Sequence, residues 1–100
     1  MAVKLLMSWD IRSGQEQTYF DFIMKTFAPG MVKLGLQPTE AWYTLFGDAP
    51  QILTGGITDN ADQMRDILDS SEWDDLRNNL MEFVENFRSK VVPATGRFQL

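Results

Sequence analysis

The sequence predicts an α+β fold whose elements follow the order βαββαβ. Three observations support this prediction: an N-terminal segment alternates apolar and polar residues, two segments repeat apolar residues with helical spacing, and a Gly-Asp-Ala-Pro turn joins two strand-like segments. The chain has 100 residues, of which 44% are hydrophobic and 23% charged, as in a globular protein with one core. We therefore expect one domain spanning residues 1–100.

The N-terminal residues have the two-residue period of a strand, and a helix start follows. The two alternating sets are Val3, Leu5, Met7 and Trp9, and Lys4, Leu6, Ser8 and Asp10. Ser13 and Glu16 then have the spacing of a capping box, with Ser at the cap and Glu three residues on. Apolar residues continue at the spacing of one helix face: Tyr19, Phe22, Ile23, Phe27, Met31 and Leu34. Pro29 and Gly30 interrupt this face, so we expect a kink or a restart there, and Gly35 to end the helix.

The second half of the chain predicts a hairpin, two helices and a last strand. Residues 40–46 are aromatic and strand-like, and residues 51–57 are their hairpin partner, where Gly55-Gly56 indicates a bulge or a close backbone approach. Residues 58–60 can cap a short helix, and Ser70-Ser71 the next. We expect that second helix to carry one apolar face and to end near Arg88 and Lys90; the face is Trp73, Leu76, Leu80, Phe83, Val84 and Phe87. Residues 94–100 are predicted to be the last strand.

This order is that of a ferredoxin-like βαββαβ unit, a four-stranded antiparallel sheet with helices on one face. The other face of the sheet also needs a cover, because both alternating sets contain apolar residues. In the second strand, for example, Trp42 and Phe46 oppose Tyr43 and Leu45. An apolar sheet face without a helix is typical of an interface. We therefore predict a homodimer in which two copies pair their sheets face to face.

Composition excludes several classes of function. A net charge of −5 disfavours binding to nucleic acid and to anionic membranes. The chain contains no Cys and no His, which disfavours disulfides, thiolate chemistry, zinc, haem iron and iron–sulfur clusters, so no cofactor is expected. No signal peptide and no apolar run near the length of a membrane span is present, which leaves a cytoplasmic location as the default.

Three stretches resemble the dimeric α/β barrel superfamily of ferredoxin-like proteins. They are Phe27-Ala-Pro-Gly-Met with Leu34-Gly35-Leu36, the hairpin Trp42-Tyr-Thr-Leu-Phe-Gly-Asp-Ala-Pro, and Ser70-Ser-Glu-Trp73. The resemblance implies that two subunits pair their sheets into a barrel, commonly with a pocket between the sheet and the helices. Members include cofactor-independent monooxygenases, haem-degrading enzymes, chlorite dismutases, muconolactone isomerases and ligand-sensing modules of transcription regulators. This chain has no His for iron, and its 100 residues leave no space for a helix-turn-helix.

Three functions fit these observations. The first is a homodimeric protein that binds a small apolar or aromatic molecule. The second is a cofactor-independent monooxygenase or isomerase, and the third is a structural interaction domain without a ligand. The sequence does not decide whether the chain is an enzyme.

Three residues are candidates for catalysis: Tyr43, Arg97 and Asp10. Tyr43 can donate a hydrogen bond or a proton from its hydroxyl. Asp10, at the end of the first strand, fits a general base if its pKa is raised. Arg97 needs a carboxylate partner or an anionic ligand if its face of the sheet is enclosed. Structural roles compete in each case, because aromatic residues mostly serve packing and most charged residues find a partner or solvent.

The first helix is expected to border a pocket between the helices and the sheet. Its Pro29-Gly30 break removes a backbone hydrogen bond and a side chain, and Gly55 and Gly56 leave further space if they face that helix. The predicted lining residues are Trp42, Met24, Phe27, Met31 and Gly56. The alternative is that the large side chains among them fill the gap, because protein interiors are closely packed.

Overall fold

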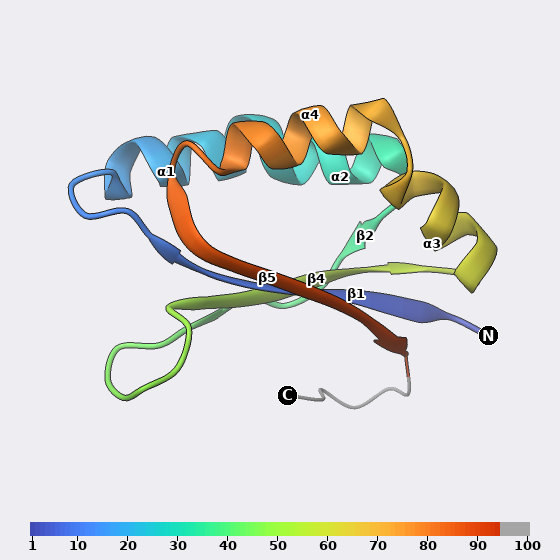
Figure 1. Ribbon diagram of the computed structural model, residues 1–100, viewed down its shortest axis with the longest axis horizontal. Coiled ribbons are helices and arrows are strands. Elements are labelled where there is room, and N and C mark those ends of the chain that lie inside the picture. The colour runs from blue at the N-terminus through green and yellow to red at the C-terminus, as the bar shows by residue number, and fades with distance from the viewer. Residues whose placement is uncertain (95–100) are drawn as a thin grey trace.

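In the computed structural model, an antiparallel sheet carries helices on one face (Figure 1), and the structure describes residues 1–94. The strands are β1 (Val3–Ile11), β2 (Gln37–Pro38), β3 (Trp42–Tyr43), β4 (Ile52–Thr58) and β5 (Val84–Pro93). The helices are α1 (Glu16–Phe22), the π-helical turn η1 (Ile23–Phe27), α2 (Ala28–Leu34), α3 (Ala61–Leu68) and α4 (Ser71–Leu80). This architecture confirms the predicted α+β, ferredoxin-like fold class.

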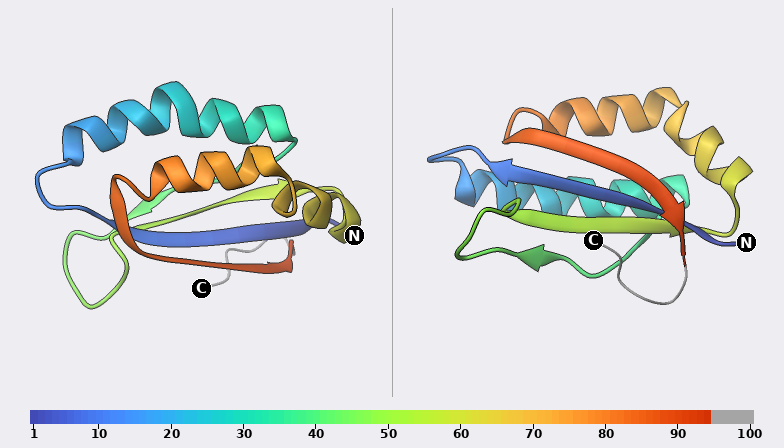
Figure 2. Two further views of the ribbon diagram at one scale, coloured as in Figure 1. Left: turned by 45° about the horizontal axis from the view of Figure 1, so that its top comes forward. Right: turned by 60° about the horizontal axis from the view of Figure 1, so that its bottom comes forward.

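The sheet has five strands rather than the predicted four, because its second strand is split in two. β1 lies between β4 and β5 and is antiparallel to both. β2 and β3 both pair with the other edge of β4, β2 at Gly56–Ile57 and β3 at Ile52–Leu53. The predicted strand over residues 40–46 is therefore paired only at Trp42–Tyr43. Residues 44–50 form a loop that projects on the side away from the helices (Figures 1 and 2).

The first helical segment runs over residues 16–34 with one irregular turn. Pro29 has no backbone N–H, and its ring crowds the carbonyl one turn earlier. The wider η1 turn, closed by a hydrogen bond from the Ala28 N–H to the Ile23 carbonyl, lies directly before it. The helix is therefore irregular just before the predicted position, at Ile23–Phe27, while α2 runs through Pro29 and Gly30. Gly35 ends α2 with φ 96°, a left-handed conformation that favours glycine, as predicted.

The end of α4 differs from the prediction. The helix ends at Leu80 and the chain turns over residues 81–83, so Val84 begins β5 instead of continuing the helical face. Pairing with β1 from Val3 to Ile11 explains this, because the sheet supplies backbone hydrogen bonds while Val84 stays fully buried in the core. The spacing of three and four residues between the apolar positions of this segment fits a continued helix as well as a turn followed by a strand, so the sequence pattern does not distinguish the two. The predicted strand over 94–100 lies, apart from Ala94, outside the described residues.

The two faces of the sheet have different surroundings. α1, α2 and α4 cover one face, the inner face, and α3 lies at one end of the sheet (Figure 2). The inner side chains of β1 are all in the core: Val3, Leu5, Met7, Trp9 and Ile11. The alternate residues and their cross-strand partners form the outer face: Lys4, Leu6 and Ser8 of β1, Leu53, Gly55 and Ile57 of β4, and Arg88, Lys90 and Val92 of β5. No helix within residues 1–94 is both long and apolar enough for a membrane crossing.

Candidate ligand site on the outer face

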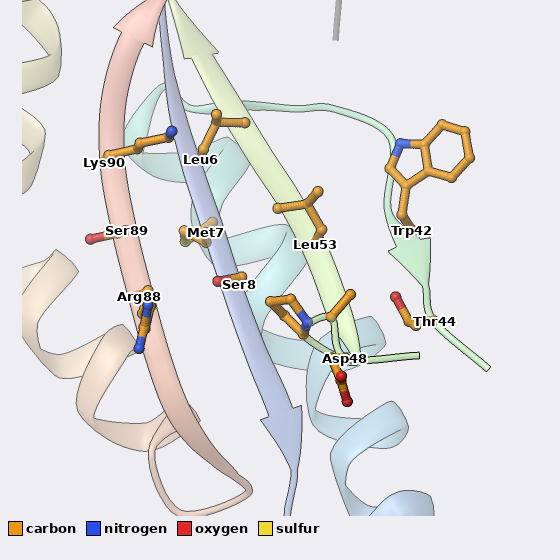
Figure 3. A pocket seen from close by; sticks show the side chains of 12 residues that line it. Leu6, Met7, Ser8, Trp42, Thr44, Asp48, Leu53, Arg88, Ser89 and Lys90 are labelled. Atoms are coloured by element: carbon orange, nitrogen blue, oxygen red, sulfur yellow. The ribbon is translucent and has the colours of Figure 1, made fainter. Parts of the chain in front are cut away.

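A groove of about 850 Å³ lies on the outer face of the sheet (Figure 3). The groove crosses the three long strands: β1 and β4 form its floor, and β5 forms one wall. The other wall is β3 with the 44–50 loop. The lining residues are Leu6, Met7, Ser8, Trp42, Thr44, Asp48, Ala49, Pro50, Leu53, Arg88, Ser89 and Lys90.

The period of the strands positions the side chains that face this groove. Lys90 lies opposite Leu6 and Arg88 opposite Ser8 in the β1–β5 register, so both cations share the outer face with the apolar floor. Trp42 lies opposite Leu53 in the β3–β4 pair, at the other wall. Figure 3 shows the Lys90 side chain directed across β1 toward Leu6.

Large apolar side chains are exposed beside the groove. Trp42 is 53% exposed, and in the adjoining loop Leu45 and Phe46 are 75% and 92% exposed. Contact between apolar side chains and water is unfavourable. This side of the molecule is therefore a surface that a partner or a ligand would cover favourably.

The groove is cationic in a chain that is acidic as a whole. Its lining contains Arg88 and Lys90 against one acid, Asp48, while the chain carries a net charge of −5. Within residues 1–94 neither cationic side chain makes an ion pair or a side-chain hydrogen bond. As far as residues 1–94 are concerned, the groove therefore has two cations without an ion-pair partner beside its apolar floor. Among the described residues, no three acidic side chains are grouped so as to hold a metal ion.

Asp10 has its carboxylate occupied by backbone and side-chain donors. Oδ2 accepts from Asn86 Nδ2 at 3.0 Å, and Oδ1 accepts from the Gln51 backbone N–H at 2.8 Å. These bonds, the one from Asn86 first, outweigh burial and lower the pKa of Asp10 below its ordinary value of 3.8. The raised pKa that a general base needs is therefore not found, and Asp10 instead fastens β4 and β5 to the end of β1.

Tyr43 belongs to the same hydrogen-bonded group. Its hydroxyl accepts from Gln51 Nε2 at 3.1 Å, while Gln51 Oε1 accepts from the Ile11 N–H at 2.7 Å. Tyr43 is 47% exposed and does not line the groove. The structure thus brings Tyr43 and Asp10 together through Gln51, at the edge of the sheet. Arg97 lies outside the described residues.

The space that the sequence predicts between helices and sheet is occupied by side chains. A Cβ added to Gly56 would lie 2.9 Å from Met31 Cε and 3.2 Å from Leu36 Cβ, and one added to Gly30 would lie 3.0 Å from Leu76. Phe27 and Met31 are buried in this packed core. The structure therefore does not gather these residues around a cavity, and the groove lies on the opposite face.

Met24 and Trp42 complete the predicted lining. Met24 is 75% exposed and so contributes to neither the core nor the groove. Trp42 alone among the predicted ligand residues lines the groove.

Sequence reasoning missed the cationic wall of the groove. Arg88 and Lys90 are two residues apart, as same-face strand residues are, but their segment was assigned to a helix because Trp73 to Phe87 also fits helical spacing. The exposed Leu45-Phe46 pair was assigned to a strand, although the Gly-Asp-Ala-Pro sequence that follows is typical of a long turn.

A buried polar pair lies on the inner face. The Trp9 indole N–H donates to the Tyr19 hydroxyl at 2.8 Å, and both residues are almost fully buried. Burial, partly offset by this hydrogen bond, raises the pKa of Tyr19 to about 12. The pair satisfies two polar groups within the aromatic core and lies apart from the groove.

Known structures show the same fold. The sequence matches no protein-family model and no curated protein. An ethyl tert-butyl ether d (EthD) family protein from Bacillus halodurans has 15% identity and a TM-score of 0.74, over 95% of this chain and 100% of that chain. A NIPSNAP family protein from Agrobacterium tumefaciens has 13% identity and a TM-score of 0.73, over 94% and 86% of the two chains.

A third similar structure is that of a dimeric protein. It is a dimeric protein of unknown function with a ferredoxin-like fold from Bacteroides fragilis, with 16% identity and a TM-score of 0.62, over 93% of this chain and 96% of that chain. Together these likenesses confirm the predicted ferredoxin-like fold. At such identities they establish the fold alone.

Proposed function

We propose that the chain is a homodimeric protein that binds a small apolar or aromatic molecule, with the outer face of the sheet as both dimer interface and ligand site. The observation that carries this proposal is the groove of about 850 Å³ on the face of the sheet that none of the helices in residues 1–94 covers. A structural domain without a ligand needs no such space.

Dimerisation follows from the exposed apolar surface. Trp42, Leu45 and Phe46 are more than half exposed on one side of the molecule, next to an outer face that contains Leu53, Ile57 and Val92. A second copy offers the same surface, so a twofold axis would bury both at once. The dimeric protein from Bacteroides fragilis, which has a similar fold, supports this arrangement.

Ligand binding follows from the size and lining of the groove. Its volume is within the range of roughly 300–1,000 Å³ that small-molecule sites have. Leu6, Leu53 and Pro50 supply apolar surface, and Trp42 offers an indole ring against which a planar molecule can stack. Binding is favoured over catalysis because Asp10, the expected base, is fixed in hydrogen bonds and ionised with a lowered pKa.

Size-exclusion chromatography with light scattering tests the dimer. The parent should have about twice the chain mass of 11.5 kDa. Leu53→Glu, on the outer face, should give the monomer, because it would place a carboxylate in the interface. The matched control is Val32→Glu on the exposed side of α2, which should leave the dimer intact. A parent that is monomeric at high concentration would contradict the proposal.

Binding of Nile red, a neutral dye, tests the ligand site. Fluorescence should rise on mixing with the parent and fall with Trp42→Ala, while the control Met24→Ala, exposed and remote from the groove, should bind like the parent. Native mass spectrometry of the freshly purified protein would show a copurified small molecule. Absence of dye binding and of any copurified molecule would favour the structural alternative.

A further inference from the structure

Arg88 is an exception among the arginines that the structure describes. Arg12, Arg65 and Arg77 each pair with a carboxylate within the chain, but Arg88 has no such partner within residues 1–94. The excess of acid over base in this chain makes carboxylates abundant, so an unpaired Arg is unexpected. The one arginine that has no ion-pair partner within the described part of the chain lines the groove.

We infer that the ligand of the groove is an organic carboxylate, held at its charged end by Arg88 and Lys90 and lying with its apolar or aromatic body over Leu6 and Leu53 toward Trp42. The inference rests on the proposed function, because it names the chemical class of molecule that the same groove would bind.

The β5 wall has the donors that a carboxylate needs. Two residues along a strand separate their Cα atoms by roughly 7 Å, so the long side chains of Arg88 and Lys90 can converge on one anion. The guanidinium offers a planar fork that fits both carboxylate oxygens, and the ammonium adds a second charge. Ser8, opposite Arg88 on β1, adds a half-buried hydroxyl as a further donor.

The remainder of the groove sets the direction of the molecule. Asp48 lies in the wall formed by the 44–50 loop, across the groove from β5 (Figure 3). It repels a carboxylate from that wall, so the charged end of the ligand should lie at β5. The apolar floor of Leu6 and Leu53 between the two walls then takes the hydrophobic body.

Pairing of two outer faces strengthens the preference for an anion. A twofold axis places the Arg88 and Lys90 side chains of both copies in one enclosed space. Cations removed from water without partners are costly, and anions in the same space would offset that cost. With a neutral ligand, these four cations would have only the two Asp48 carboxylates of the opposite walls to balance them.

The test compares 2-naphthoate with 2-naphthamide, which share an aromatic body and differ in charge. Isothermal titration of the dimer at an ionic strength of about 0.15 M should give roughly 10- to 100-fold tighter binding of the carboxylate, as charge-assisted hydrogen bonds imply. Arg88→Gln and Lys90→Gln should each remove most of this preference for the carboxylate over the amide. The control Arg65→Gln, which removes the same charge from the surface of α3, should keep it.

Several outcomes would overturn the inference. Equal affinity for the two naphthalenes would reject the carboxylate while leaving the proposed binding site in place, whereas absence of binding by both would reject the binding site itself. Dissociation of Arg88→Gln into monomers without ligand would show that this cation pairs with the second copy instead. A preference that Arg65→Gln loses as well would assign it to overall charge and not to the groove.

Discussion

The two faces of this sheet are built from the same strands and have opposite packing. On the inner face, Trp9 is 1% exposed and the space above Gly56 is filled by Met31 and Leu36. On the outer face, Trp42 is 53% exposed and a groove of about 850 Å³ remains. The difference shows that glycine does not by itself make a cavity. Large neighbours fill the space it leaves, unless no element lies on that side.

The largest expected difference between the faces concerns their tryptophans. Trp9→Ala should reduce the free energy of unfolding by about 3–5 kcal/mol, because it empties the core and removes the donor to Tyr19. Trp42→Ala should change the stability of the monomer by less than about 0.5 kcal/mol. Urea denaturation of dilute protein measures both. Equal losses would show that the outer face is part of the folding core.

Adding volume should distinguish the faces in the same way. Gly56→Leu should cost roughly 1–3 kcal/mol or more, because even its Cβ would lie 2.9 Å from Met31 Cε. Ala49→Leu adds a similar volume at the exposed wall of the groove and should leave the stability unchanged, while reducing ligand binding. Thermal and urea unfolding measure the first effect. Unaltered stability of Gly56→Leu would indicate space on the inner face after all.

The two tyrosine hydroxyls provide a finer comparison. Tyr19→Phe should cost about 1–3 kcal/mol, because it leaves the buried indole N–H of Trp9 without its acceptor. Tyr43→Phe removes a partly exposed hydroxyl and should cost less than about 0.5 kcal/mol. Urea unfolding at neutral pH measures both. Similar losses of unfolding free energy in the two variants would show that water does not replace the hydrogen bond between Gln51 and the Tyr43 hydroxyl.

The raised pKa of Tyr19 also predicts a dependence on alkaline pH. The folded protein keeps the Tyr19 proton up to a pKa of about 12, above the ordinary value of 10.0. This contribution to stability is therefore complete below pH 10 and is lost as the pH rises through about 12. Parent and Tyr19→Phe should differ in the slope of stability against pH in this window, and parallel curves would contradict the buried position of the hydroxyl.

The smallest expected effect is at acidic pH. The pKa of Asp10 is lowered by its bonds from Asn86 and Gln51, so its contribution to stability is complete above the ordinary value of 3.8 and is lost as the pH falls through the lower value of the folded state. Asp10→Asn should flatten this part of the stability curve. The exposed Asp66→Asn serves as control and should follow the parent curve.

The elements that could be predicted were those whose local pattern and tertiary role agree. The alternation in β1 and the caps at Asn60 and Ser70 were read correctly, because each depends on neighbouring residues. β5 was assigned to a helix, because Val84 and Phe87 fit a helical face and only pairing with β1 distinguishes the two. That pairing joins residues about 80 positions apart and has no local pattern.

The candidate site was less predictable than the fold. Trp42 was expected to contact a ligand and does line the groove, but Arg88 and Lys90 were hidden by the wrong helix assignment. The space above Gly56 depends on which side chains reach it, and composition cannot show that Met31 does. A cavity is a property of side chains from separate elements, whereas the alternation of β1 and the caps at Asn60 and Ser70 can be recognised within a few residues. Local patterns can still mislead, because α1 begins at Glu16 after Gln15 without a side-chain cap, and the capping box predicted at Ser13 and Glu16 does not form.

The π turn η1 sets the rotational phase of the first helix. At about 100° per residue, Tyr19 and Phe27 would point about 80° apart on a regular α-helix. The π turn takes up one extra residue, which reduces the difference to about 20°. Both rings can therefore contact Trp9, at 6.5 Å and 6.0 Å between ring centroids. Removing one exposed residue such as Thr26 would let this turn close as a regular α-helix with the two rings still about 20° apart, so both could keep their contact with Trp9, whereas removing a residue from α1 or α2 would turn one ring away from it.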